Sequence, residues 1–399
     1  MSEPKTLRLL EGVRILAFTQ FLLGPAACQY LADMGADVIK IEPPGRGAWE
    51  RSWSGADTFI GGVSAFFMLA NRNLRSVTLN LKSKRGVEVA QRLVETADVV
   101  VENFRPGVMD RLGLGYEALR KINPRIIYAA GSGYGGDGPY SHLPGQDLLI
   151  QAISGLGANT GTEGQGPTVS AAAVVDQHSA SLLAMGILAA LVSRGRTGEG
   201  QRVEVVMVQA ALDLQAEPIV YHLNGAQLRR PKTPAADTFH AVPYGFYATA
   251  DGYLAISLTP VKALSEALGN PADLALYENP DIAYTRRDEI RVALDPYFRE
   301  RTTEEWVDLL RTHDIWCAPV KNMNETFEDV AVKHIAPVLE FEHPRAGRVR
   351  VLKHPVRYSS GEATLRRPPP DLGEHTDAVL GELGYDAGQI EAMREEHVI

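Results

Sequence analysis

Short apolar runs alternate with amphipathic segments over the first 134 residues. Residues 13–18 read VRILAF, a run typical of a buried strand, and Gly24-Pro25 then opens an apolar helix that extends to Gly35. A second apolar run, VIKIE, follows at 38–42. A strand, a helix and a strand at this spacing predict a βαβ unit, which normally belongs to a parallel sheet.

The same alternation continues and predicts a doubly wound α/β domain. Strands are expected at 76–81, 98–103 and 125–134, and helices near 84–97 and 106–121. The turn after the first strand reads TQFLLGP and lacks the G-x-G-x-x-G fingerprint. A domain that binds a nicotinamide dinucleotide is therefore disfavoured.

A cluster of glycines follows the strand at 125–134. These residues, Gly131, Gly133, Gly135 and Gly136, are interpreted mainly as surface-turn positions. The alternative is that glycine lets the backbone come close to a ligand.

The strongest apolar segment predicts a long helix that begins at Asp176. The run Leu182–Val192 contains no proline, and Gly195 and Gly198 are expected to end the helix before a strand at 202–206. This 11-residue run is too short to span a bilayer. An Asp at a helix start is most often an N-cap. The alternative is a nucleophile, because helix N–H groups and the positive dipole end favour an ionised carboxylate.

The second half of the chain predicts a smaller α+β region. Prolines between 225 and 245 indicate a boundary or linker. Beyond it, strands are expected near 245–249 and 253–257, a buried strand at 315–320, helices near 261–268, 285–300 and 303–313, short strands beyond 335, and closing helices at 375–383 and 387–396.

Composition narrows the function classes. The 399 residues are 45% hydrophobic and 22% charged, with a net charge of −9 that gives no support for a nucleic-acid partner. Cys28 and Cys317 lack the spacing of a disulfide framework or a metal site. The N-terminus lacks the pattern of a secretory signal. We expect a soluble cytoplasmic protein with no metal and no membrane partner.

Six segments together resemble the class III CoA-transferase family of the CaiB/BaiF type. They are FTQFLLGPAACQYLADMGADVIKIEPPGRG (18–47), TLNLK (78–82), VVVENFRPGVMDRLGLGY (99–116), SAAAVVDQHSA (170–180), GRTGEGQRVEV (195–205) and PPPDLGEHTDAVLGELGY (368–385). The family includes formyl-CoA transferase, carnitine CoA-transferases and the related α-methylacyl-CoA racemases. The resemblance covers essentially the whole chain, in order.

The resemblance implies an architecture. Residues 1–225 would form a large Rossmann-like CoA-binding domain with the catalytic Asp and a linker helix. Residues 226–335 would form a small α+β domain, and 336–399 would be a return linker and the C-terminal part of the large domain. Two subunits would interlock as a homodimer.

It also implies a reaction and a site. Asp176 matches the transferase nucleophile, which exchanges CoA between an acyl-CoA and a small carboxylic acid through an aspartyl anhydride and an aspartyl-CoA thioester. CoA and acyl-CoA are substrates, and no cofactor is bound permanently. The positions that match CoA-contacting residues are Leu79, Lys82, Asn103, Phe104 and Arg111.

Departures from the family pattern weigh against the racemases. Their GHD motif reads Gly145-Gln146-Asp147 here, and no Glu follows the YGFYATADGYLAIS segment. Gln146 cannot act as a base near neutral pH, and Asp147 is interpreted as a supporting or structural carboxylate. A racemase or epimerase with other bases stays an alternative. A non-catalytic CoA-binding subunit is a second one.

The sequence says less about which acyl-CoA donor and which carboxylic acid acceptor react. Pro43-Pro44 stands where formyl-CoA transferase has arginine-like residues, so formate and oxalate are disfavoured. A dicarboxylic donor such as succinyl-CoA would need a cation for its distal carboxylate. His178, Arg230 and His240 are candidates for that contact.

Overall fold

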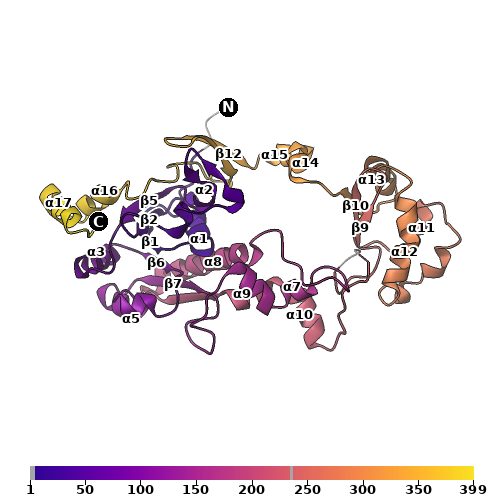
Figure 1. The fold of residues 1–399 in the computed structure, drawn as a ribbon, viewed down its shortest axis with the longest axis horizontal. Coiled ribbons are helices and arrows are strands. Elements are labelled where there is room, and N and C mark those ends of the chain that lie inside the picture. The colour runs from indigo at the N-terminus through magenta and orange to yellow at the C-terminus, as the bar shows by residue number, and fades with distance from the viewer. Residues whose placement is uncertain (1–4, 234–236) are drawn as a thin grey trace. The chain divides into compact units, whose positions relative to one another are not determined.

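The computed structural model describes residues 5–233 and 237–399, which form two compact units (Figure 1). The first unit contains the chain up to Ile150 together with Ala173–Leu214 and Pro337–Ile399. The second contains Gln151–Ala172 and Gln215–Ala336.

A six-stranded parallel sheet forms the centre of the first unit. Its order is β5-β2-β1-β6-β7-β8, with Ile15 of β1 opposite Val38 of β2 and Val99 of β6. The strands are β1 Arg14–Phe18, β2 Asp37–Glu42, β5 Leu74–Thr78, β6 Val99–Glu102, β7 Ile127–Ser132 and β8 Arg202–Val206. The predicted parallel sheet is therefore confirmed. The strand order reverses between β1 and β6, and doubly wound sheets bind ligands at such a point.

Helices cover both faces of this sheet. One face packs on α3 (Lys84–Glu95), α5 (Tyr116–Ile122), α16 (Thr376–Glu382) and α17 (Ala387–Glu395), which share an apolar core with the strands. Helices α1 (Leu23–Asp33) and α8 (Val174–Thr197) contribute nothing to that core and instead pack against each other, β1 and β7. Two helices from the C-terminal end of the chain thus help to cover one face of the sheet.

Two helix predictions need correction. The helix expected near 106–121 is two helices, α4 (Val108–Arg111) and α5, because Gly113 adopts a left-handed φ of 72° between them. Helix α8 continues through Gly195 and ends where Gly198, at φ 79°, donates its N–H to the carbonyl of Arg194. Its 24 residues are long and apolar enough to cross a membrane, and in the single chain α8 packs on α1 and β7 while other apolar side chains of the helix stay exposed.

Several further short elements belong to the first unit. They are the 3₁₀ turns Trp49–Arg51 and Gly55–Asp57, β3 Phe59–Ile60, β4 Val63–Ser64, α2 Ala65–Ala70, α6 Asp147–Ile153, which runs into the second unit, α9 Met207–Leu214, and the hairpin of β12 Val338–His343 with β13 Gly347–Leu352. Only the last pair was expected from the sequence.

The second unit is α+β, built on the antiparallel sheet β11-β10-β9. Its elements are α7 Leu156–Asn159, α10 Ala216–Leu223, β9 Gly245–Ala248, β10 Tyr253–Ile256, α11 Val261–Ala267, the 3₁₀ turns Ala275–Tyr277 and Pro280–Ile282, α12 Arg287–Phe298, α13 Thr303–Thr312, β11 Cys317–Pro319, α14 Met323–Glu328 and α15 Val330–Ile335. The expected burial of the strand at 315–320 is wrong. It is an edge strand, and Trp316 beside it is 63% exposed.

The unit limits differ from the expected limit at 225. Residues 151–172 and 215–225 belong to the second unit. One reason is Arg230, whose guanidinium donates to the carbonyls of Gln165 and Gly166 at 2.9 and 3.1 Å. Such contacts tie segments that are about 65 residues apart in sequence, so periodicity could not reveal them.

Candidate active site

A cavity of about 610 Å³ opens at the point where the strand order of the sheet reverses. Its wall includes the loops after β1 (Gln20–Leu23), β6 (Asn103–Pro106) and β7 (Ser132–Tyr134), and also Asp176. Every lining residue belongs to the first unit. A concave, largely apolar space at a switch point is where α/β proteins hold small ligands.

Asp176 lies in the first turn of α8 but does not cap the helix. The N-cap position is Ala173, which has no side chain able to do so. Asp147 performs this role from α6: its Oδ1 accepts the N–H groups of Val175 at 2.8 Å and Asp176 at 2.9 Å. The N-cap interpretation of Asp176 is therefore wrong. Within 5–233 and 237–399, the structure records no hydrogen bond or ion pair to the carboxylate of Asp176.

Burial, together with the smaller effect of the neighbouring charge of Asp147, raises the pKa of Asp176 to about 7. The sequence suggested the opposite, because helix N–H groups and the dipole favour an ionised carboxylate. That expectation fails first because burial penalises the charged form, and second because Asp147 occupies two of these N–H groups and adds a like charge beside Asp176. Once ionised, a carboxylate with a raised pKa is a stronger base and a better nucleophile than an ordinary carboxylate.

Two glycines bring the loop after β7 back toward α8. A Cβ placed on Gly133 would lie 2.4 Å from the Cα of Gly145, so the two backbones cross in direct contact. A Cβ on Gly131 would lie 2.6 Å from Cδ2 of Leu23 at the start of α1. The surface-turn interpretation is thus wrong for Gly131 and Gly133, which serve close approach. Gly135 is buried too, with a left-handed φ of 92°, and only Gly136 is exposed as a surface position should be.

One wall of the cavity is aromatic, which the sequence analysis missed. The rings of Phe21, Trp49, Trp53 and Phe66 follow one another with centroid separations of 4.7, 5.0 and 5.0 Å. Phe21, Trp49 and Trp53 are each more than 40% exposed, although large apolar rings normally avoid water. The available signal was two tryptophans four residues apart in a loop that predicts no regular element.

Buried ion pairs hold this aromatic wall. Lys40 Nζ contacts Glu50 Oε1 at 2.7 Å, and Glu50 Oε2 accepts the N–H of Phe21, which adopts a left-handed φ of 62°. The guanidinium of Arg51 binds both carboxylate oxygens of Glu42, at 2.6 and 2.7 Å. Lys40 and Glu42 come from β2, so the strand fixes the loop that carries Trp49.

Comparison with known proteins agrees with this site. The model of CoA-transferase family III matches residues 10–376. The chain belongs to this family. It is a family III CoA-transferase, and the resemblance seen in its motifs is confirmed.

Relatives with named activities match over nearly their whole lengths. The chain is 35% identical to the succinyl-CoA:glutarate CoA-transferase of Mus musculus, over 98% of this chain and 90% of that protein. It is 33% identical to the formyl-CoA:oxalate CoA-transferase of Shigella sonnei, over 98% and 99%.

Solved structures agree with the fold. A crystal structure of a probable fatty acyl-CoA transferase from Mycobacterium tuberculosis superimposes with a TM-score of 0.81 at 33% identity, over 94% of this chain and 99% of that chain. A CaiB/BaiF family protein from Brucella suis gives a TM-score of 0.79 at 31% identity, over 94% and 100%.

The positions matched to CoA contacts in this transferase fall into three groups. Asn103 and Phe104 line the cavity, and the amide of Asn103 also clamps Gln20 by hydrogen bonds of 2.9 and 2.8 Å to its N–H and carbonyl. Lys82 and Arg111 are exposed and do not line the cavity. Leu79 is 1% exposed and packs in the core, so its side chain is a structural residue and not a surface contact.

The three candidates for a distal carboxylate are engaged elsewhere in the transferase. His178 Nε2 lies 2.8 Å from Asp213 Oδ2, and His240 Nδ1 lies 2.6 Å from Asp237 Oδ2. Arg230 donates to backbone carbonyls of its own unit. None of the three lines the cavity.

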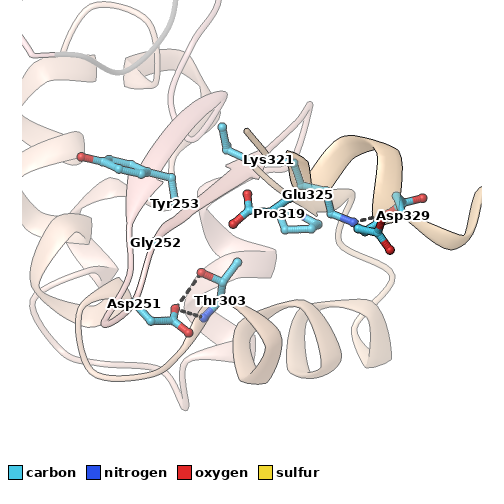
Figure 2. Close-up of a pocket in the computed structure, with 10 residues that line it drawn as sticks. Asp251, Gly252, Tyr253, Thr303, Pro319, Lys321, Glu325 and Asp329 are labelled. Carbon is cyan, nitrogen blue, oxygen red and sulfur yellow. Dashed lines mark hydrogen bonds and ion pairs between the residues drawn. The ribbon is translucent and has the colours of Figure 1, made fainter. Parts of the chain in front are cut away.

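A second cavity, of about 370 Å³, lies in the second unit and is rich in carboxylates (Figure 2). Each has a structural partner: Asp251 accepts the N–H and hydroxyl of Thr303, Glu325 closes a capping box at α14, and Asp329 caps α15 and pairs with Lys321. Throughout the described ranges, no cluster of three or more His, Cys, Asp or Glu side chains suits a metal. Glu328, the remaining carboxylate of the lining, pairs with Lys333, so helix capping, hydrogen bonds and ion pairs account for the acidic cavity.

Proposed function

We propose that the chain transfers CoA from an acyl-CoA to a carboxylic acid, with Asp176 as the nucleophile. The observation that carries the proposal is the placement of Asp176. Its carboxylate faces a cavity at the switch point of the sheet, and Asp147 relieves it of the capping role. A half-buried carboxylate with a pKa raised to about 7 and no bonded partner among the described residues is poised to react rather than to stabilise.

The reaction proceeds by exchange of activated acyl bonds. A carboxylate oxygen of Asp176 attacks the thioester carbonyl, the C–S bond breaks, and CoA leaves as a thiolate. The thiolate then attacks the aspartyl carbonyl of the mixed anhydride and displaces the first carboxylic acid as its carboxylate. An aspartyl-CoA thioester remains. Because each adduct of a carboxylate is itself activated, the thioester energy is conserved.

The acceptor reverses these steps. Its carboxylate attacks the aspartyl thioester, and the CoA thiolate leaves. The thiolate then attacks the acceptor carbonyl of the new anhydride, which releases the new acyl-CoA and regenerates the carboxylate of Asp176. Each attack produces an oxyanion, which backbone N–H groups stabilise. The glycine-rich segment around Gly131 and Gly133 lines the cavity and lets the backbone come close.

A racemase is less compatible with the cavity. Two-base racemisation needs a second free base opposite the first. Among the described residues that line the cavity there is no His or Glu, Gln146 replaces the family's His, and Asp147 is used as a helix cap. Exchange of the α-proton in deuterated water without any acceptor would nevertheless reveal this activity.

The homodimer is also part of the proposal. Apolar side chains of α8 and α9 stay in solvent in the single chain, with Met185 at 61%, Val192 at 64% and Leu212 at 42% exposure. Exposed apolar surface of this kind supports association with a second copy, and the family resemblance supports interlocking. Sedimentation should give twice the 43.4-kDa chain mass at micromolar concentration. A monomer at that concentration would refute the dimer.

The decisive experiment traps the covalent intermediate. The protein is incubated with succinyl-, acetyl-, propionyl- and branched dicarboxyl-CoA, quenched with hydroxylamine or borohydride, and mapped by mass spectrometry. Modification is expected at Asp176 and should disappear in Asp176→Asn. Asp213, an exposed carboxylate near α8, serves as the control that must stay unlabelled. CoA binding without any adduct on Asp176 would refute the mechanism.

A further inference from the structure

Helix α8 depends on another element for its N-terminal cap. The first N–H groups of a helix have no intrahelical acceptor, and a side chain at the N-cap usually accepts from the second or third helical residue. Ala173 cannot do this. Oδ1 of Asp147, 29 residues before Asp176, accepts from the second and third residues instead.

The position of Asp147 is set by the backbone crossing. Gly145 contacts Gly133 directly, so the chain returns from the end of β7 and begins α6 next to α8. Asp147 is the first residue of α6 and is 8% exposed. Its carboxylate therefore lies between the cavity, which it lines, and the start of α8.

We propose that Asp147 is the positioning residue of the nucleophile: it fixes the first turn of α8, keeps Asp176 from capping its own helix, and places a fixed negative charge beside it. This inference rests on the proposed role of Asp176. Asp147 touches no reacting atom in the scheme, so it acts through Asp176.

The proposed electrostatic effect requires that the charge acting on Asp176 come from Asp147 and not from another group. Other ionisable groups lie near Asp176: Arg105 and Tyr134 line the same cavity, and Tyr30 of α1 donates its hydroxyl to Gln177, the next residue of α8. Of all charged groups, Asp147 is the one whose field raises the pKa of Asp176. Removing that charge should lower this pKa, because the ionised form loses a like-charged neighbour.

Two substitutions separate position from charge. Asp147→Asn keeps an oxygen that can accept both N–H groups and removes the charge. Asp147→Ala removes both. Asp386→Asn is the matched control, since Asp386 caps α17 of the same unit by accepting the N–H of Gln389 and does not line the cavity.

For Asp147→Asn, the acidic limb of the kcat/KM profile should move to lower pH by about one unit, with KM for acyl-CoA unchanged. For Asp147→Ala, kcat should fall by about 100-fold, because a small displacement of a reacting group is that costly. Asp386→Asn should change neither. A ¹³C NMR titration of Asp176, assigned by comparison with Asp176→Asn, should show the same downward shift without any substrate.

The outcomes distinguish the two proposals. If Asp147→Asn leaves the acidic limb and the NMR titration of Asp176 where they are, and Asp147→Ala lowers only the melting temperature, Asp147 is merely structural and the inference fails. Adduct formation at wild-type Asp176 would then still support the transferase mechanism. If wild-type Asp176 forms no adduct but its titration shifts in Asp147→Asn, the electrostatic coupling stands and the mechanism fails.

Discussion

Lys40 and Glu50 form an ion pair of 2.7 Å in which the two side chains are 1% and 0% exposed. The pair lies behind the aromatic wall, and Glu50 also accepts the N–H of Phe21. Removing one member of a buried pair leaves an uncompensated charge. This contact therefore supports both the stability of the first unit and the shape of the cavity.

Substitution Lys40→Met should lower the free energy of unfolding by about 3–5 kcal/mol, the usual cost of an orphaned buried charge. The double variant Lys40→Met/Glu50→Gln should recover part of this loss. Guanidinium-induced unfolding measures both. Arg286→Ala removes a pair with Glu289 whose side chains are 40% and 57% exposed, and it should have little effect. A loss below about 1 kcal/mol in Lys40→Met would contradict the prediction.

The raised pKa of Asp176 predicts a pH-dependent stability. Between about pH 4 and 7 the unfolded chain releases the proton of Asp176 while the folded protein keeps it, since the pKa rises from 3.8 to about 7 on folding. The unfolded state then binds fewer protons, so stability falls as pH rises through this window. Asp176→Asn cannot ionise and escapes this loss.

Asp176→Asn should thus be more stable than the wild type above pH 7, by about 2–4 kcal/mol, because one pKa unit is worth about 1.4 kcal/mol. Below pH 4 the two proteins should be alike. Thermal unfolding at a series of pH values gives the difference, and Glu102, whose pKa is also about 7, cancels because both proteins contain it. A difference that does not vary with pH would count against a raised pKa of Asp176.

The glycine crossing predicts opposite effects at two glycines. Gly133→Ala places a methyl group 2.4 Å from Gly145 Cα, so the loop must move and Asp147 with it. We expect a loss of about 2 kcal/mol or more in stability and a lower transfer rate. Gly195→Ala in α8 meets no atom within 4 Å and should stabilise the protein by about 0.5–1 kcal/mol. Denaturant unfolding measures the stability of both variants, and the transfer assay measures their rates. Equal effects of the two substitutions would contradict the close contact of Gly133 with Gly145.

The aromatic wall predicts a fluorescence response to the substrate. Trp49 and Trp53 are 42% and 43% exposed and line the cavity, so an acyl-CoA should change their emission. The double variant Trp49→Phe/Trp53→Phe should lose this change. Trp316→Phe, at an exposed position outside the cavity, should keep it. An undiminished response in the double variant would place the ligand elsewhere.

Lys82 and Arg111 are expected to bind the phosphates of CoA. Both are exposed, and the structure records no ion pair for either within the described residues. Replacing each by Ala should weaken CoA binding by roughly tenfold, since a hydrogen bond to a charged group is worth about 1.5 kcal/mol. Binding of an acyl-pantetheine thioester, which lacks the nucleotide phosphates, should not change. Lys84→Ala, on an exposed lysine paired with Glu88, is the control.

Sequence alone determined most strands of the parallel sheet and singled out Asp176 as the candidate nucleophile. Strands β1, β2, β6, β7 and β8 were predicted within a few residues, because burial on a sheet leaves continuous apolar runs that a reader can recognise. Asp176 was selected by its place before an apolar helix and by the surrounding motif. Strands and motifs of this type can be recognised from the order of residues within a short segment.

Only the tertiary structure decided how Asp176 is held. The cap from Asp147, the contact of Gly133 with Gly145, and the pairing of Lys40 with Glu50 each join residues that no local pattern connects. The same holds for Leu79, whose position matched a CoA contact but whose side chain lies in the core. The periodicity of apolar residues shows which face of a helix or strand is buried, but not which residues from distant parts of the chain contact it. Those long-range contacts set the charge and the geometry of the site.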